Sequence, residues 1–249
     1  MNRLAGKIAL VTGAAQGLGE AISKAFGKEG AHVILTDINE KHLEETTNEI
    51  KNEGCSASSL YLDVTNEEKW KEVTNSVLEQ FGQLDILVNN AGIGVHGNIE
   101  STTFESWKNV LNINLDGTFL GTKYGAEAMI KAGNGGSIIN MSSIAGLVGD
   151  PELLAYAASK GGVRLLTKAA ALHLSKTKTN IRVNSIHPGY INTELIHLVP
   201  NVDEILSMVP MNKLGDPDVI GQAAVYLASD DSSFTTGSEL VIDGGYTAQ

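Results

Sequence analysis

The chain has 249 residues, of which 42% are hydrophobic and 19% are charged, so it can build a core and lacks the composition of a disordered protein. Its 18 Lys and Arg and 29 Asp and Glu give a formal net charge of −11, which disfavours nucleic acid and anionic membrane surfaces as partners. The single cysteine excludes an intrachain disulfide, and no apolar stretch approaches the ~18 residues of a membrane span, so we expect a cytoplasmic protein.

Short runs rich in Val, Ile and Leu alternate with longer amphipathic segments along the chain. This alternation predicts strands of a parallel sheet that are connected by helices. The expected strands are residues 7–12, 32–37, 59–63, 86–89, 137–141, 182–187 and 239–243, and the expected helices are residues 17–29, 40–53, 67–81, 104–131, 152–175 and 217–228. No linker or repeat interrupts the pattern, so we expect one α/β domain over residues 1–249, a Rossmann-like doubly wound parallel sheet with helices on both faces.

A glycine-rich turn follows the first expected strand, where TGAAQGLG places Gly13, Gly17 and Gly19 at the start of a helix. Glycines at such a turn let the backbone approach a pyrophosphate at the positively polarised helix N-terminus. The spacing differs from the standard G-x-G-x-x-G, and glycines can also serve tight packing alone. A dinucleotide is nevertheless the natural ligand.

Asp37 ends the second expected strand, close to the ~20 residues after the glycines at which an acidic residue binds the adenosine ribose. A carboxylate at this position repels a 2′-phosphate, so NAD is favoured over NADP. Lys41 and His42 are the nearby residues that argue the other way. The alternative for Asp37 is a helix cap or a loop residue.

Tyr156 and Lys160 lie four residues apart in an expected helix and therefore share one face. A nearby ammonium favours the phenolate and lowers the pKa of a tyrosine from ~10, which makes the pair a plausible acid–base unit. Alone, this spacing is common on ordinary helices. Ser142 and Ser143 follow the fifth expected strand and NNAG at residues 89–92 follows the fourth, so all of them are expected at the sheet edge where ligands bind.

These motifs, with Asn114 and HPGYINT at residues 187–193, resemble the short-chain dehydrogenase/reductase family over essentially the whole chain. Within it, residues 140–164, 183–195 and 236–249 are most similar to R-specific secondary alcohol dehydrogenases of lactic acid bacteria and their cyclic-alcohol relatives. The resemblance implies that Tyr156 exchanges a proton with the substrate oxygen and that Lys160 lowers the pKa of Tyr156 and binds the nicotinamide ribose. It also implies that Ser143 orients the carbonyl and that Asn114 holds a water, while the hydride passes to or from the nicotinamide.

The cofactor-binding residues that the resemblance implies lie along the same edge of the sheet. They are Gly13, Gln16, Gly17, Leu18 and Gly19 at the pyrophosphate, Asp37 at the adenosine ribose, Asp63 and Val64 at the adenine, Asn90, Gly92, Tyr156 and Lys160 near the nicotinamide ribose, and Pro188, Gly189, Ile191 and Thr193 near the carboxamide. The lactobacillar enzymes prefer NADP and lack an acid at the position of Asp37. Here the residue outweighs the resemblance, and NAD (NADH) remains the expected cofactor.

Residues 190–212 fit the family's substrate loop and are largely apolar, with Leu195, Ile196, Leu198 and Val199 among them. An apolar secondary alcohol or its ketone suits such a lining, although a packed surface helix has the same pattern. A 3-oxoacyl-thioester (carrier-protein) reductase is the second candidate. It ranks below the alcohol dehydrogenase because the charged residues of the loop, Glu194, Asp203 and Glu204, are acidic and would not bind a phosphate or an acidic carrier protein. A hydroxysteroid dehydrogenase is the third, and a dinucleotide-sensing or scaffold protein is the non-enzymatic alternative.

The family resemblance also carries expectations about assembly and metals. It implies a homotetramer, packed through the long helices at residues 104–131 and 152–175. It further implies a structural magnesium ion at the terminal carboxylate of Gln249. Catalytic zinc is not expected, because the six histidines form no close ligand pair.

Overall fold

The computed structural model describes residues 2–193 and 202–249 and contains one parallel sheet of seven strands in the order β3-β2-β1-β4-β5-β6-β7. The strands are β1 (Ile8–Thr12), β2 (His32–Asp37), β3 (Ser56–Tyr61), β4 (Ile86–Asn89), β5 (Gly136–Met141), β6 (Ile181–Pro188) and β7 (Glu239–Ile242). The strand order reverses direction between β1 and β4, where an open α/β sheet leaves a crevice for a ligand. The predicted doubly wound sheet is confirmed.

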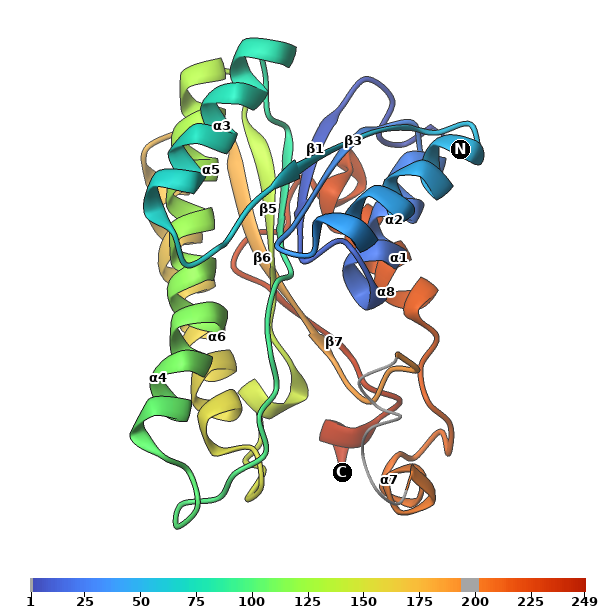
Figure 1. Cartoon of the computed structure of the whole chain (residues 1–249), viewed down its shortest axis with the longest axis vertical. Helices are drawn as coiled ribbons and strands as arrows, with labels where there is room; N and C mark the ends of the chain where they lie inside the picture. The colour runs from blue at the N-terminus through green and yellow to red at the C-terminus, as the bar shows by residue number, and fades with distance from the viewer. Residues whose placement is uncertain (1, 194–201) are drawn as a thin grey trace.

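Helices cover both faces of the sheet (Figure 1). One face carries α1 (Gly17–Lys28), α2 (Glu40–Asn52) and α8 (Pro217–Ala228), and the other carries α3 (Glu67–Phe81), α4 (Phe104–Leu111), α5 (Gly117–Ala132) and α6 (Leu154–Lys176). The remaining helix, α7 (Val202–Met208), lies beyond the carboxyl ends of the strands, near the C-terminus.

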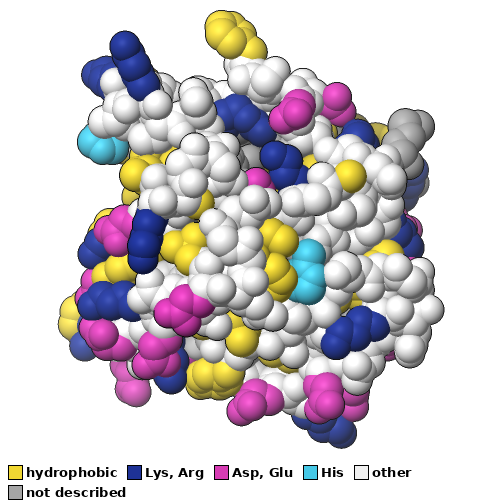
Figure 2. Space-filling view, turned by 90° about the horizontal axis from the view of Figure 1, so that it is seen from above, with side chains coloured by type: hydrophobic (Ala, Val, Ile, Leu, Met, Phe, Trp, Pro, Cys, Tyr) yellow, Lys and Arg dark blue, Asp and Glu magenta, His cyan; other side chains and the backbone are white. Residues whose placement is uncertain are grey.

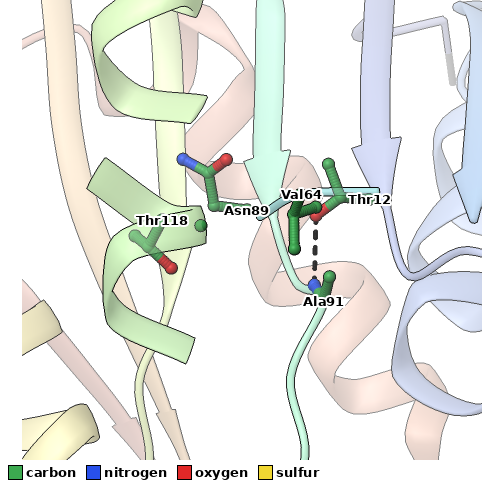
Figure 3. Close-up of a pocket in the computed structure, with 6 residues that line it drawn as sticks. Thr12, Val64, Asn89, Ala91 and Thr118 are labelled. Atoms are coloured by element: carbon green, nitrogen blue, oxygen red, sulfur yellow. Dashed lines mark hydrogen bonds between the residues drawn. The ribbon is translucent and has the colours of Figure 1, made fainter. Parts of the chain in front are cut away.

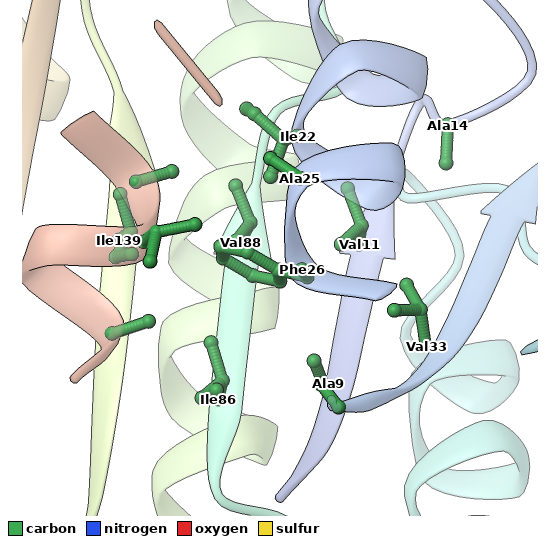
Figure 4. Close-up of a cluster of buried hydrophobic side chains, with 14 of the residues drawn as sticks. Ala9, Val11, Ala14, Ile22, Ala25, Phe26, Val33, Ile86, Val88 and Ile139 are labelled. Atoms are coloured by element: carbon green, nitrogen blue, oxygen red, sulfur yellow. The ribbon is translucent and has the colours of Figure 1, made fainter. Parts of the chain in front are cut away.

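Two apolar cores follow from the alternation of side chains along the strands. Ala9 and Val11 of β1 face the α1 and α8 layer, whereas Ile8 and Leu10 face the α3 and α5 layer. In the first core, Phe26 of α1 reaches across to β4 (Figure 4). Because both faces of the strands are buried, the strands read as continuous apolar runs in the sequence.

Side chains at the helix starts explain several boundaries that the sequence predicted. Asn66 accepts hydrogen bonds from the first-turn amides of α3, and Gly82, with φ of 75°, ends that helix. Asp216 caps α8 in the same way, with Pro217 at the first helical position. These two helices have the predicted boundaries.

Most predicted boundaries differ from the structure by at most two residues, and two elements differ more. β3 begins at Ser56 rather than residue 59, because it pairs with β2 from His32 onwards, and the His32 ring bonds the hydroxyls of Ser56 and Ser58 at 2.7 and 2.9 Å. The helix expected over residues 104–131 is interrupted by a π-helical turn at Asn112–Asp116. An extra residue in a helical turn redirects side chains and is frequent at functional sites.

The end of the molecule away from α7 carries acidic and basic side chains intermixed, with scattered apolar patches (Figure 2). No helix among the described residues is long and apolar enough to cross a membrane.

Candidate active site

The glycine turn between β1 and α1 leaves no space for side chains where its backbone folds back. Gly13 and Gly17 both have φ of 61°, a left-handed conformation that favours glycine. A Cβ at Gly19 would lie 2.1 Å from the Gly13 carbonyl oxygen. Gln16 caps the start of α1 through its backbone only, and Leu18 packs against the α1-side core. The turn therefore presents backbone at a helix N-terminus, which fits a pyrophosphate.

Asp37 is bonded to this turn. Its Oδ2 accepts from the Ala15 amide at 3.2 Å, and its Oδ1 accepts from the Asn39 amide at 2.9 Å. Asn39, not Asp37, caps α2. The carboxylate thus stands at the carboxyl end of β2 beside the glycine turn, and the next residue, Ile38, is apolar and 65% exposed.

The two basic residues near Asp37 are engaged elsewhere. The Lys41 side chain is largely exposed and lies 3.9 Å from Glu45. The His42 Nδ1 lies 3.1 Å from the side-chain amide nitrogen, Nδ2, of Asn39. Neither contact directs a positive charge towards Asp37.

The NNAG turn after β4 is fastened to β1. Asn90 donates from Nδ2 to the Thr12 and Gly13 carbonyl oxygens at 2.9 and 3.0 Å, and its backbone amide donates to the Thr12 hydroxyl. Thr12 also accepts from the Ala91 amide at 3.0 Å (Figure 3). Asn90 therefore shapes the glycine turn in this structure.

A narrow pocket lies at the ends of β1 and β4, lined by Thr12, Val64, Asn89, Ala91, Gly117 and Thr118 (Figure 3). Asn89 is buried, and its Oδ1 has no partner among the described residues. Val64 is also buried, and Asp63 accepts from the Thr65 amide and hydroxyl at 2.9 and 2.7 Å. Asp63 thus follows β3 in a short turn instead of ending the strand as predicted.

The α6 helix and the end of β5 hold the candidate acid–base pair. The Lys160 ammonium lies 5.5 Å from the centre of the Tyr156 ring and donates to the Met141 carbonyl oxygen at 2.8 Å. The Ser142 hydroxyl donates to the Lys160 carbonyl oxygen at 2.9 Å, which gives Ser142 a structural role. Lys160 is buried, and this burial lowers its pKa to about 8.

The pKa of Tyr156 depends on its burial and on Ser143. Burial raises the pKa of the Tyr156 hydroxyl, and a hydrogen bond with Ser143 only partly offsets the increase. Ser143 is the group that favours the phenolate here, and its own Oγ accepts from the Ala145 amide at 3.1 Å.

Asn114 lies in the π-helical turn and is fully buried. Its side chain accepts from the Ile93 amide at 2.8 Å and donates to the Ile93 carbonyl and to the Ser159 hydroxyl at 2.9 and 3.1 Å. Ser159 in turn donates to the Tyr156 carbonyl at 2.7 Å. A Cβ at Gly92 would lie 3.2 Å from Asn114 Oδ1 and 3.4 Å from Lys160 Nζ. Because Gly92 has no side chain, there is space beside both the Asn114 amide and the Lys160 ammonium.

The segment after β6 closes the other side of the cleft. The Gly189 amide donates to the Ile242 carbonyl at 2.8 Å, and Ile191 is buried and bridges to Gly215. A Cβ at Gly17 would lie 4.0 Å from the Thr193 methyl group, so this segment crosses to the glycine turn. Pro188 is the last residue of β6.

The expected substrate loop is described only in part. Leu195, Ile196, Leu198 and Val199 lie outside the described residues, as does Glu194. Val209 is buried, and the Met211 amide donates to the Gly244 carbonyl at 3.1 Å. The Gln249 side chain donates to the Met208 carbonyl at 3.0 Å, so the C-terminal residues hold the end of this segment.

Comparison with known proteins agrees with this geometry. A family model described as "Enoyl-(Acyl carrier protein) reductase" matches residues 13–247. The NADP-dependent (R)-specific alcohol dehydrogenase of Lentilactobacillus kefiri is 45% identical, and the alignment covers 100% of this chain and 99% of that enzyme. The chain belongs to the short-chain dehydrogenase/reductase family.

Other relatives of this short-chain dehydrogenase/reductase span several activities. The cyclopentanol dehydrogenase of Comamonas sp. (strain NCIMB 9872) is 43% identical, with 100% of both chains covered. The 3-oxoacyl-[acyl-carrier-protein] reductase of Thermotoga maritima is 40% identical, with 98% of both chains covered. A solved short-chain type dehydrogenase/reductase from Mycobacterium marinum superposes with a TM-score of 0.94 at 34% identity, covering 99% of this chain and 97% of the other. The chain is therefore an oxidoreductase of a family that uses a nicotinamide cofactor.

Two contributors to the site of this dehydrogenase were not predicted from its sequence. Thr12 anchors the NNAG turn through its hydroxyl, and the Met141 carbonyl holds the Lys160 ammonium. A threonine at the end of a buried strand, directly before the glycine turn, is a signal that could have identified the first. The second is a backbone carbonyl, whose role cannot be predicted from the residue type.

Gly19 offers a direct test of the glycine turn. Gly19→Ala should weaken the binding of NADH and NADPH by at least about 10-fold, because the added Cβ would collide with the Gly13 carbonyl and the Asn90 amide and displace the turn. Fluorescence titration of each reduced cofactor measures the dissociation constants. Gly149→Ala is the matched control, since a Cβ there meets nothing within 4 Å. Unchanged binding by a folded Gly19→Ala protein would show that the turn does not hold the cofactor.

Proposed function

We propose that this short-chain dehydrogenase/reductase interconverts an apolar secondary alcohol and its ketone with NAD(H). The single observation that carries the proposal is the cluster of Ser143, Tyr156 and Lys160 at the same sheet edge as the glycine turn and Asp37. An acid–base group and a dinucleotide cradle are the two parts that a hydride transfer requires.

Tyr156, Ser143 and Lys160 have different roles in the proposed reaction. The nicotinamide, when bound, accepts or supplies the hydride. Tyr156 takes the proton from the alcohol in oxidation and returns it to the carbonyl oxygen in reduction. Ser143 donates a hydrogen bond to the same substrate oxygen and favours the phenolate of Tyr156. Lys160 adds positive charge beside the ring, and it stays largely protonated below its pKa of about 8.

Asn114 completes the proposed set as a relay residue. A water held near Asn114 would pass protons between Lys160 and solvent, with Gly92 leaving space between the amide and the ammonium. The bonds from Asn114 to Ile93 and Ser159 keep the π-helical turn against α6. Gln16, Leu18, Asp63, Val64, Asn90, Pro188, Gly189, Ile191 and Thr193 remain the proposed cofactor contacts, with Gly13, Gly17 and Gly19 at the pyrophosphate.

Asp37 supports NAD over NADP, even though the relative from Lentilactobacillus kefiri is NADP-dependent. Its carboxylate is fixed beside the glycine turn by the Ala15 and Asn39 amides, where a ribose hydroxyl could donate to it. A 2′-phosphate at the same place would meet this negative charge. The exposed apolar side chain of Ile38 supplies no compensating cation.

The thioester alternative is favoured by the carrier-protein reductase of Thermotoga maritima, which is 40% identical over nearly the whole chain. Two observations argue against it. All charged residues within 190–212 are acidic, and the chain as a whole is strongly acidic, so an acidic carrier protein would be repelled. An apolar substrate has no such penalty. We therefore favour the alcohol and ketone pair.

The proposed assembly is a homotetramer in the cytoplasm. Phe104, Phe119, Leu165 and Leu172 are exposed on α4, α5 and α6, and a second copy would cover them. A magnesium ion at the terminal carboxylate of Gln249 remains part of this proposal. Among residues 2–193 and 202–249, no group of three or more His, Cys, Asp or Glu side chains could hold a metal, so other ligands would come from water or from neighbouring copies.

Replacement of the Tyr156 hydroxyl tests the acid–base role. Tyr156→Phe should lower kcat by about 100-fold to 10,000-fold, because proton transfer to the substrate oxygen is lost, while the NADH dissociation constant stays within about 2-fold. Initial rates with an aryl methyl ketone measure the loss. Tyr226→Phe, on the far end of α8, is the matched control and should keep full activity. Light scattering should give a tetramer for both proteins. Near-normal turnover in the Tyr156 variant would contradict the mechanism.

Removal of the Asp37 charge tests the choice of cofactor. Asp37→Asn combined with Ile38→Arg should shift the ratio of NADPH to NADH dissociation constants by at least about 10-fold towards NADPH, because a cation replaces an anion beside the 2′ position. The asparagine keeps an acceptor for the Ala15 amide. Glu40→Gln removes the same charge at the first residue of α2 and should leave the ratio unchanged. Tighter NADPH than NADH binding by the unaltered protein would contradict the assignment.

A further inference from the structure

We propose that His187 is a positioning residue that holds the Ser143 turn in the orientation required for its hydrogen bond with Tyr156. The inference rests on the proposed function, because it assumes that Ser143 and Tyr156 act on the substrate. The ring nitrogens of His187 bond the Ser185 hydroxyl and the Ser143 carbonyl, so His187 acts on Tyr156 through the serine turn.

His187 lies at the carboxyl end of β6, the strand next to the edge strand β7. It is fully buried near the end of β6, between β5 and β7, and directly precedes Pro188. Ser143 lies two residues beyond β5, the neighbouring strand. A buried imidazole at this position therefore joins the serine turn to the strand that leads into the proposed carboxamide contacts.

The hydrogen bonds of His187 determine its tautomer. Its Nδ1 lies 3.1 Å from the Ser143 carbonyl oxygen, which can only accept, so Nδ1 carries the hydrogen. In the neutral ring, Nε2 then accepts from the Ser185 hydroxyl at 2.9 Å. The Ser238 carbonyl competes for this hydroxyl at the longer distance of 3.4 Å. Ser185 thus stabilises the tautomer that can bind Ser143.

Ser143 makes two further hydrogen bonds inside its own turn. The Ser143 carbonyl also accepts from the Gly146 amide at 2.9 Å, which closes the turn on itself. The Ser143 hydroxyl accepts from the Ala145 amide at 3.1 Å. These two bonds shape the turn internally. The Ser142 amide joins the start of the turn to the Ile186 carbonyl of β6 at 2.8 Å, and the bond from His187 fixes the next carbonyl, that of Ser143. Without His187, the Ser143 peptide could rotate relative to Tyr156.

The surroundings of His187, burial first, lower its pKa and favour the neutral imidazole. Burial lowers its pKa, and the positive charges of Arg164 and Lys160 on α6 act in the same direction. The Ser143 carbonyl and the Glu239 carboxylate on β7 oppose them. Arg164 is 2.7 Å from Glu239, which offsets much of the effect of that carboxylate.

The position of Ser143 affects the pKa of Tyr156. The hydrogen bond with Ser143 lowers the pKa of Tyr156, against the increase caused by burial. If the turn rotates, this bond weakens and the pKa rises. Alcohol oxidation needs the phenolate, so its rate at acidic pH should fall and the acidic limb of its pH profile should move to higher pH.

Two similar polar variants separate positioning from packing. In His187→Asn the side-chain amide nitrogen lies near the place of Nδ1 and can donate to the Ser143 carbonyl. In His187→Gln the amide lies farther out, near the place of Nε2, and can reach Ser185 instead. The experiment measures kcat/KM for NAD-linked oxidation of cyclohexanol from pH 6 to pH 10, with the NADH dissociation constant and melting temperature of each protein.

The expected result is a midpoint about 0.5 to 1 pH unit higher for His187→Gln than for the unaltered protein, with His187→Asn close to the unaltered value. Cofactor binding should be the same in all three. If His187→Gln does not fold, His187→Leu removes both bonds at similar volume and should shift the midpoint in the same direction. Equal midpoints in folded variants would overturn the inference, whereas an unaltered protein that oxidises no secondary alcohol would overturn the proposed function instead.

Discussion

The hydrogen bond between the Lys160 ammonium and the Met141 carbonyl fixes α6 against the end of β5, and the rest of the site depends on that register. A buried ammonium needs a partner, because charge without one is costly inside a protein. The Ser142 hydroxyl binds the Lys160 carbonyl from the same strand end, and Asn140 binds Thr167 two turns along α6. Together these contacts bring Tyr156 within reach of Ser143.

A second set of contacts builds the cofactor side of the cleft. Thr12 and Asn90 connect the NNAG turn to the glycine turn, and Asp37 connects the glycine turn to the end of β2. All of these residues lie at carboxyl ends of adjacent parallel strands. The parallel sheet thus gathers, at one edge, groups that are far apart in the chain, and Asn114 joins them from the π-helical turn.

The sequence was most informative where one physical signal dominated. The β4 boundaries follow from a run of buried apolar residues, and the α3 boundaries follow from Asn66 and Gly82. β3 was shorter in the prediction because its small polar residues look like a loop, while pairing with β2 determines where it begins. The π-helical turn was not predicted, because a single wider turn inside a long helical stretch is not marked by any residue type.

For the site, the sequence predicted which residues lie together but not their electrostatics. Motif spacing identified Tyr156, Lys160, Ser143 and Asn114, and the sheet brings them to one edge. Their electrostatics depend on burial and orientation, which spacing does not encode: burial raises the pKa of Tyr156, and the Lys160 ammonium bonds the Met141 carbonyl. His187 was visible only as part of HPG, and its position between Ser143 and Ser185 emerges from the pairing of β5 and β6.

The most direct test of the proposed reaction is a comparison of initial rates with NADH and NADPH on four substrates: an aryl methyl ketone, a cyclic ketone, a steroid ketone and an acetoacetyl thioester. The account predicts the highest kcat/KM for the simple ketones with NADH. Preference for the thioester, or no turnover of any ketone despite cofactor binding, would contradict it.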